Sequence, residues 1–160
     1  MTEARGPLRC GACTLCCTVM KVTMPAEVKP AHQTCRHCSE KGCAIYAVRP
    51  EICAVFQCFW LGSQSVPGWA LDPALRPDRC GVVVDMNSAG TIIAHCHRPA
   101  SWKREPIHAW LLAMAARTNV MLELGGATAL LRADGSTVAL TCIGVDPTTN
   151  NRLYVHEAAQ

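Results

Sequence analysis

The sequence predicts an α+β protein built from two unlike parts. Nine of its twelve cysteines lie within residues 1–62, where little helical or strand periodicity is seen. Beyond residue 80, apolar strand-like runs alternate with turn residues, and one helical pattern lies between them. We therefore expect an irregular cysteine-rich module with one short helix over residues 1–61. A connector over 62–79 and a small, mainly antiparallel sheet with one helix over 80–160 should follow.

Composition narrows the class of protein. Half of the 160 residues are hydrophobic, 17% are charged, and 15 basic residues stand against 12 acidic ones. This balance fits neither a disordered polyampholyte nor a strongly basic nucleic-acid binder. No apolar run approaches the roughly 20 residues of a membrane helix, and the first ten residues lack the apolar stretch of a signal peptide. These features predict a cytoplasmic protein that does not contact the membrane.

The spacing of the first cysteines predicts metal binding rather than disulfides. The cytosol keeps thiols reduced, and nine cysteines cannot all pair with one another. Cys10, Cys13 and Cys16 are each two residues apart, as in the cysteine run of bacterial ferredoxins. The steps Cys13 to Cys16 and Cys35 to Cys38, about 20 residues apart, also have the spacing of a zinc ribbon. The pattern therefore indicates a metal and leaves zinc and a [4Fe-4S] cluster both open.

Adjacent Cys16 and Cys17 are expected to differ in role. Neighbouring side chains in an extended stretch face opposite ways, so both thiols cannot easily reach one tetrahedral ion. We expect one of the two thiols to ligate the first centre. The other ligates a second centre or lies buried as a small hydrophobic residue.

Residues 50–61 are expected to form the helix of the module. Pro50 near the first helical position and Gly62 just past the end are typical helix boundaries. Cys53 and Cys58 fall on separate sides of this helix, so they should serve different centres unless the helix breaks between them. An apolar stripe at helical spacing is expected to pack as core, and it comprises Ile52, Val55, Phe56, Phe59 and Trp60.

These residues resemble the YkgJ-type cysteine cluster family, which is named for a C-x-x-C-x-x-C-C motif and described as zinc- or iron-chelating domains. The resemblance spans about residues 10–61 and includes Tyr46, Arg49-Pro50, Phe56 and Trp60. Flagellin lysine N-methylases carry a similar pattern, which keeps an iron-sulfur enzyme open. Cys38 is an addition to the pattern and stays a further candidate ligand. Carried over residue by residue, the resemblance implies eight metal ligands: Cys10, Cys13, Cys16, Cys17, Cys35, Cys43, Cys53 and Cys58.

Eight thiolates could form two four-sulfur sites, or one site with thiols in reserve. Four thiolates around zinc, or around a [4Fe-4S] core of charge 2+, leave a net charge of about −2. Two such sites would take the formal net charge from +3 to about −1, which argues against nucleic acid as a partner. Arg36 and Arg49 lie beside expected ligands, where a guanidinium would lower thiol pKa values.

The remaining residues predict a sheet with little chemistry of its own. Cys80, Cys96 and Cys142 occur singly and are expected to be buried, inert thiols. His95 and His97 alternate on one face of a strand, where a solvent-facing pair is the commoner outcome. No phosphate-binding loop, nucleophile elbow or metalloprotease helix is present. The expected elements are a hairpin of residues 81–86 and 91–97, a helix over 105–118, and strands over 120–124, 128–132 and 137–143.

Three functions follow from these observations. The first is a cytoplasmic metal-binding protein in which zinc or iron orders the module, or is stored and delivered. The second is a redox or group-transfer enzyme built on a [4Fe-4S] cluster. The third is a zinc module that recruits another protein or a nucleic acid, and the small net charge weakens it.

Overall fold

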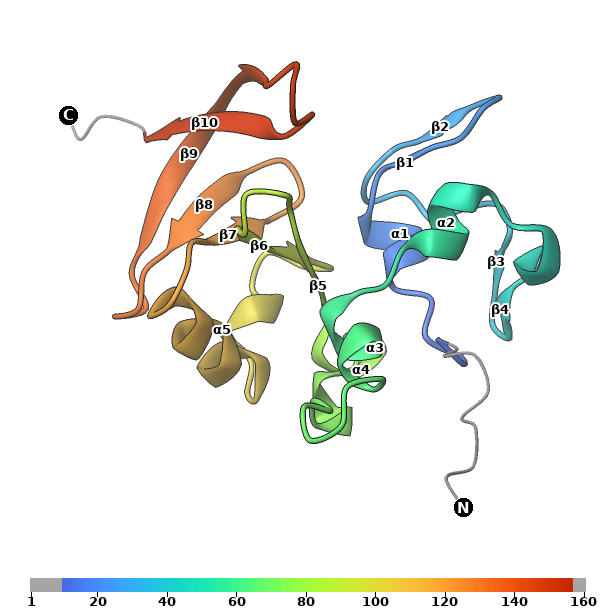
Figure 1. Ribbon diagram of the computed structural model, residues 1–160, viewed down its shortest axis with the longest axis horizontal. Coiled ribbons are helices and arrows are strands. Elements are labelled where there is room, and N and C mark those ends of the chain that lie inside the picture. Colours follow the sequence, from blue (N-terminus) through green and yellow to red (C-terminus); the bar gives the residue numbers. More distant parts are fainter. Residues whose placement is uncertain (1–9, 157–160) are drawn as a thin grey trace.

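The computed structural model describes residues 10–156 and confirms a mixed α+β fold. Figure 1 shows the cysteine-rich part on one side and a twisted sheet on the other. The cysteine-rich part contains no extended sheet, and its elements are short. They are α1 (Cys16–Val19), β1 (Val22–Thr23), β2 (Val28–Lys29), β3 (Cys38–Ser39), β4 (Gly42–Cys43), the 3-10 helix η1 (Tyr46–Val48), α2 (Glu51–Val55) and α3 (Phe59–Ser63).

The sheet has six strands in the order β10-β9-β8-β7-β6-β5, so it is larger than the small sheet predicted. Four pairings are antiparallel and β6 with β7 is parallel, which confirms the mainly antiparallel arrangement. Strand β10, which was not predicted, follows turn residues 146–151 at the edge of this sheet. The strands are β5 (Val82–Met86), β6 (Ile92–Cys96), β7 (Val120–Glu123), β8 (Thr128–Leu131), β9 (Thr137–Val145) and β10 (Arg152–His156).

Helix α5 (Ile107–Ala115) connects the parallel strands β6 and β7, and Figure 1 shows it beside the sheet. A parallel pair needs such a crossover because a tight turn can join only antiparallel neighbours. Ile107 and Leu111, one turn apart, are fully buried. The short 3-10 helix η3 (Ser101–Lys103) precedes α5 and buries Trp102 in the same core. One apolar core therefore lies between this helical layer and the sheet.

The predicted connector is folded rather than open. It contains the 3-10 helix η2 (Pro73–Leu75) and helix α4 (Pro77–Cys80), and both α3 and α4 pack against β5. The indole Nε1 of Trp60 donates to the Asp72 carbonyl at 3.2 Å. Phe59 meets Trp110 of α5 edge to face, with ring centroids 5.9 Å apart. Helix α3 is thereby fixed to the core that the sheet and α5 share.

The single helix expected over residues 50–61 is wrong, because the chain breaks between α2 and α3. Phe56 and Cys58 have extended backbone angles, and Cys58 becomes the N-cap of α3. With the helix interrupted, the apolar stripe does not stay on one face. Ile52 and Val55 are exposed, at 47% and 68%, so the prediction that they pack as core is also wrong. Phe59 and Trp60 do pack against the core.

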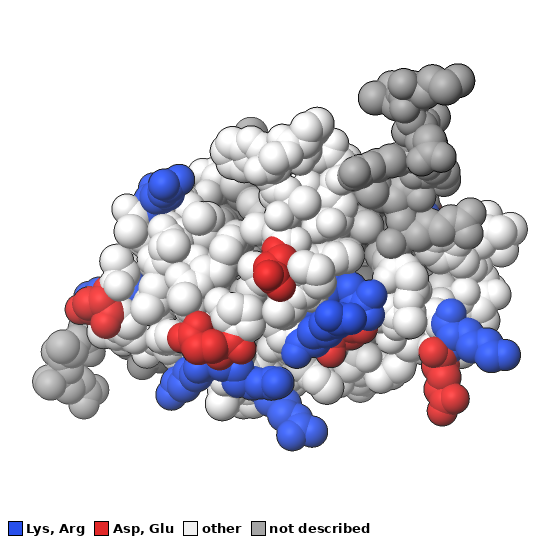
Figure 2. Space-filling model, turned by 90° about the horizontal axis from the view of Figure 1, so that it is seen from below, with Lys and Arg blue, Asp and Glu red and all other residues white. Residues whose placement is uncertain are grey.

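Charged side chains on the face shown in Figure 2 are mixed in sign. Where described residues form this surface, Lys and Arg side chains lie close to Asp and Glu side chains along its lower edge. Arg76 and Asp78 form an ion pair, with 2.6 Å between Nη2 and Oδ2. This face therefore offers no broad basic surface of the kind that phosphate backbones require.

Within residues 10–156, no helix is long and apolar enough to cross a membrane.

The core can be tested at Leu111, which is fully buried between α5 and the sheet. Leu111→Ala should lower the free energy of unfolding by about 2–5 kcal/mol, because it removes buried methyl groups and leaves a cavity. Ile143→Ala is the matched control, since Ile143 is 63% exposed and its truncation should cost less than about 0.5 kcal/mol. Urea denaturation followed by tryptophan fluorescence measures both. Equal losses in the two variants would contradict this core.

Candidate metal centre

The opening cysteines lie on a tight turn and the short helix after it. Gly11 has a φ of +61°, which a residue with a side chain adopts only with strain, and the Cys13 amide donates to the Cys10 carbonyl at 3.2 Å. Cys16 and Cys17 then begin α1, whose Val19 is fully buried. Successive helical residues point about 100° apart, so the two adjacent thiols face different surroundings.

The second group of cysteines is brought to α1 by backbone hydrogen bonds. The Cys35 amide donates to the Cys17 carbonyl at 2.9 Å, and the Cys38 amide donates to the Cys35 carbonyl at 2.9 Å. Strands β3 and β4 form a small hairpin in which Cys38 stands opposite Cys43. A Cβ placed on Gly42 of this hairpin would lie 3.5 Å from the Gly11 carbonyl oxygen, so the hairpin packs closely on the opening turn.

The break between α2 and α3 separates the last two cysteines. Cys53 lies within α2, whereas Cys58 caps α3 and its Sγ accepts from the Leu61 amide at 3.5 Å. An amide that donates to sulfur stabilises a thiolate, which is the form that binds metal.

The predicted ligands surround two adjacent cavities. A cavity of about 250 Å³ is lined by seven of the eight, and a smaller one of about 20 Å³ is lined by Cys58 together with three of those seven. The structure therefore brings all eight to one region. Cys38 does not line either cavity. The ligands at the larger cavity are Cys10, Cys13, Cys16, Cys17, Cys35, Cys43 and Cys53, and those that Cys58 joins are Cys10, Cys13 and Cys16.

The smaller cavity sets its four lining cysteines apart from the other four, and the electrostatic neighbours of Cys58 and Cys53 follow this division, whereas the pKa of Cys10 is raised by burial and then by Cys17 across it. Burial is the main cause that raises the pKa of Cys58, and Cys10 adds to it, whereas the pKa of Cys53 is raised by burial and by Cys17, Cys35 and Cys43. Burial likewise raises the pKa values of Cys10 and Cys13. We call Cys10, Cys13, Cys16 and Cys58 the first group, and Cys17, Cys35, Cys43 and Cys53 the second group.

The two groups meet at Cys16 and Cys17. A hydrogen bond between these two thiols is the main cause that raises the pKa of Cys16 and lowers that of Cys17. The nearby Lys29 cation also lowers the pKa of Cys17. The proton therefore stays on Cys16, and Cys17 is the more readily ionised of the pair.

Lys29 is a buried cation beside the second group, and the sequence analysis did not find it. The residue is 8% exposed, and its Nζ donates to the carbonyls of Thr18 at 3.1 Å and Gln33 at 2.8 Å. Burial lowers the pKa of Lys29, and the neighbouring thiols Cys35 and Cys17 oppose that effect. The side chain therefore ties α1 to the loop after β2 and places a positive charge near thiols that become negative when they bind metal.

The burial of Lys29 could not be predicted from the sequence, because the two-residue strand β2 is too short to show a periodic burial pattern. The one signal in the sequence was that Lys29 lies six residues before Cys35.

Burial raises the pKa values of Cys10 and Cys53, and the nearby Arg49 guanidinium opposes this effect, which confirms the expected influence of Arg49 on the thiols. Arg49 lies over the Tyr46 ring, with 3.8 Å between its Cζ and the ring centroid, and donates to the Tyr46 carbonyl at 2.7 Å. Arg36 is exposed and pairs with Glu27 at 2.7 Å.

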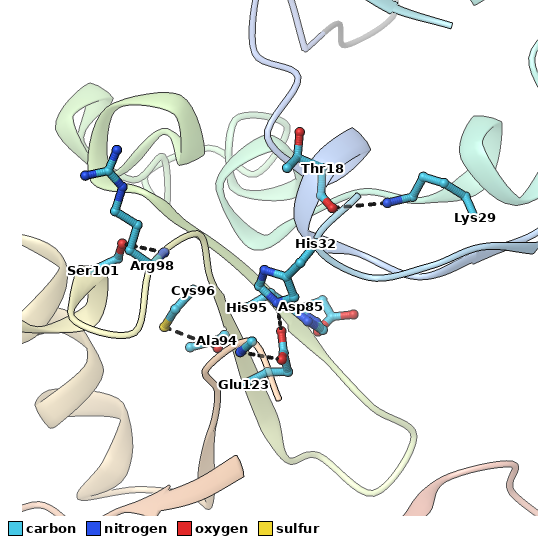
Figure 3. A network of polar contacts seen from close by, with 11 residues as sticks. Thr18, Lys29, His32, Asp85, Ala94, His95, Cys96, Arg98, Ser101 and Glu123 are labelled. Carbon is cyan, nitrogen blue, oxygen red and sulfur yellow. Dashed lines mark hydrogen bonds and ion pairs between the residues drawn. The ribbon is translucent and has the colours of Figure 1, made fainter. Parts of the chain in front are cut away.

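Two histidine–carboxylate pairs lie where the cysteine-rich part meets the sheet. Figure 3 shows His32 reaching Glu123, and their Nε2 and Oε2 atoms are 2.8 Å apart. His95 lies 3.0 Å from Asp85, and Asp85 also lines the larger cavity. His95 is half-buried against this carboxylate. His97 lies just beyond β6 and is exposed, so the expected solvent-facing pair is confirmed only for His97.

The three cysteines of the sheet region differ in burial. Burial raises the pKa of Cys80 to about 11 and that of Cys96 to about 12, which confirms them as buried thiols. Cys142 is exposed, so the expectation that it is buried is wrong. Strand β9 continues past the end of β8 and pairs there only with β10, which leaves residues 141–145 without a covering layer.

Thiol sulfurs are the ligands that soft metals prefer, but these thiols are not arranged at metal-binding distances from one common point. Among residues 10–156, no group of three or more Cys, His, Asp or Glu side chains is arranged so as to hold a metal. The eight sulfurs instead surround open space, on short elements that few apolar contacts hold. Soft thiolate ligands select zinc or iron-sulfur clusters over hard cations such as Mg²⁺ and Ca²⁺. By ligand type alone, these thiols suit zinc and an iron-sulfur cluster equally.

Lys29→Met tests the link between α1 and the loop after β2. Losing the ammonium leaves the carbonyls of Thr18 and Gln33 without this donor, at a cost of about 1–3 kcal/mol. Hydrogen exchange followed by mass spectrometry should show faster exchange in residues 16–20 and 33–38, with α5 unchanged. Lys41→Met is the matched control because Lys41 is exposed, and it should leave both segments unchanged. Unaltered exchange in Lys29→Met would contradict the role of this residue.

Comparison with protein-family models, with curated proteins and with solved structures found no match to this chain.

Proposed function

We propose that the protein binds metal through its eight amino-terminal cysteines, arranged as two four-sulfur centres that adjoin at Cys16 and Cys17. The observation that carries this proposal is the convergence of all eight thiols on two adjacent cavities. They come from five separate segments of the chain, and a fold without use for them would have no reason to gather them.

The first centre comprises Cys10, Cys13, Cys16 and Cys58. Three of these thiols come from the opening turn and α1, and Cys58 reaches them from the break before α3. Amides point toward the sulfurs here, since Cys58 receives that of Leu61, and the backbone of Asp78 hydrogen-bonds to Cys13. Such donors are the outer partners that orient thiolates around a metal and offset their charge.

The second centre comprises Cys17, Cys35, Cys43 and Cys53. It takes one thiol from each of α1, the loop after β2, β4 and α2. Lys29 lies beside it and offsets part of the net charge of about −2 that four thiolates and a divalent metal carry. Adjacent Cys16 and Cys17 are thus assigned to different centres, which adjoin where these two thiols interact.

Both centres would serve to hold the amino-terminal part together. Val19 is the one buried apolar side chain among residues 10–60, so this part has almost no core. Small domains without a core commonly gain their stability from bound metal, because only the folded state binds it. The free energy of metal binding then adds to the free energy of folding. A structural role follows directly from this shortage of apolar burial. Storage or delivery would use the same ligands.

Zinc is the first candidate metal, and a [4Fe-4S] cluster is the second. Zinc is a single ion that four sulfurs enclose at about 2.3 Å, so it needs little open space. The larger cavity measures about 250 Å³, and that room favours a polynuclear cluster at the second centre. The iron-sulfur alternative therefore stands on a specific feature of the structure.

Metal analysis of anaerobically purified protein tests the proposal. We expect about two zinc ions per colourless chain. An iron-sulfur protein would instead be brown and contain about four irons with matching sulfide at each occupied centre. Protein that keeps neither zinc nor iron after gel filtration would overturn the proposal.

Single substitutions test how the cysteines divide. Cys58→Ser should lose the metal of the first centre, and Cys53→Ser that of the second, so each variant should retain about half of the wild-type content. Cys142→Ser is the matched control, because Cys142 is exposed and distant in sequence, and it should retain full content. If each ligand variant lost all metal, the two centres would be one polynuclear site.

A further inference from the structure

Strand β10 forms one edge of the six-stranded sheet, and within residues 10–156 no strand pairs with its outer side. The other edge, β5, is enclosed, because α3 and α4 pack against it and Val82, Val83 and Val84 are all buried. By contrast, none of the residues 152–156 is buried. Figure 1 shows β10 on the outer side of the sheet, away from α5. An open edge presents unpaired backbone N–H and C=O groups, which form a template for another strand.

Strand β10 lacks residues that usually keep edge strands apart. Residues 152–156 contain neither proline nor lysine. Leu153 and Val155 are 44% and 42% exposed, and Ile143 and Val145 of the neighbouring strand β9 are 63% and 51% exposed. Beyond the end of β8, β9 pairs with β10 alone, and a two-stranded ribbon is only marginally stable in water. A further strand at this edge would therefore stabilise the ribbon and cover apolar side chains.

The direction of the backbone groups along β10 follows from the turn that precedes it. The Asp146 amide donates to the Asn151 carbonyl at 2.8 Å, so the backbone groups of Asn151 point toward β9. Successive residues of a strand point their backbone groups to opposite sides. The β-bulge in this ladder places its extra residue, Ile143, in β9, so β10 keeps the alternation. The N–H and C=O groups of residues 152, 154 and 156 therefore point to the open edge.

We propose that β10 pairs with β10 of a second copy of this chain, antiparallel about a two-fold axis through Tyr154. In this register Tyr154 lies opposite its own counterpart, and Arg152 lies opposite His156 of the second copy. All three outward residues of each strand then take part, and they exchange about six backbone hydrogen bonds. Moving the axis by one residue would use only two of the three.

The side chains of β10 match one another in the same register. Leu153 lies directly opposite Val155 of the second copy, so each exposed apolar residue of the strand meets another one. The Tyr154 rings of the two copies form a cross-strand aromatic pair on the other face. This self-complementarity is the reason to assign the edge to a second copy. The inference is independent of metal binding, since β10 lies outside the cysteine-rich part.

A two-fold pairing uses the same surface on both copies, so it closes at two chains. The β5 edge of the described sheet is packed against α3 and α4, so it does not extend the assembly into a filament. Stable interfaces use roughly 20–30 residues on each partner, and β9 and β10 together provide fewer. We therefore expect a weak dimer that exchanges with the monomer.

Analytical ultracentrifugation of the purified full chain tests the proposal between about 5 μM and about 500 μM, the range in which weak complexes dissociate. A reducing agent excludes a dimer linked through the exposed thiol of Cys142. The mass should rise from 17.2 kDa toward twice that value as the concentration increases. Amide exchange measured by NMR should slow at residues 152, 154 and 156 in concentrated protein. The amides of residues 153 and 155, which already face β9, should change little.

Tyr154→Pro and Val155→Lys are the decisive variants. Proline removes an outward N–H and leaves the hydrogen bonds to β9 intact. Lysine places a charge opposite Leu153 of the second copy. Each should raise the dissociation constant of the dimer about tenfold or more. Val66→Lys is the matched control, because Val66 is 46% exposed but lies in the loop after α3, and it should dimerise as wild type.

Three results would overturn the proposal. The first is a wild-type chain that stays monomeric at every concentration. The second is a dimer that neither Tyr154→Pro nor Val155→Lys weakens, because another surface would then join the copies. The third is an assembly larger than two chains, because the pairing would not be two-fold. Circular dichroism shows whether each variant is folded, and amide exchange of the wild type at two concentrations needs no variant.

Discussion

The amino-terminal part must form a defined structure with almost no apolar core, and the rest of its organisation follows from that constraint. Between residues 10 and 60, Val19 is the one buried apolar side chain. Hydrophobic burial is the dominant stabilising term in most domains, so other contacts must replace it here. Lys29 supplies one of them, because its ammonium joins two backbone segments that carry cysteines. Under the proposed function, metal bound by the gathered thiols would supply the remainder.

The sheet and its helices give this part a fixed surface to rest on. Helix α3 packs through Phe59 on Trp110, and the thiol of Cys58 caps the start of the same helix. On the other side, the His32 ring reaches Glu123 of β7 and lies against Gly125 (Figure 3). The cysteine-rich part is thus attached to a well-packed core at two places. Cysteines far apart in sequence are thereby held near one another without a core of their own.

The proposed centres would depend on the redox state of their thiols. Four-thiolate centres are stable while their sulfurs stay reduced, and they release metal when a ligand is oxidised.

Local patterns in the sequence were enough to predict most of the sheet and the residues of the candidate site. The periodicity of residues 81–143 predicted strands β5 to β9 and α5, and the resemblance of the cysteine pattern to a known family implied eight ligands, all of which line the two cavities. These features are local, since they depend on neighbours along the chain. The tertiary structure decided what depends on distant contacts: the break that sends Cys58 to the first group, the burial of Lys29, the added strand β10 and the placement of Cys38. No local pattern encodes these, because each is fixed by residues far away in sequence.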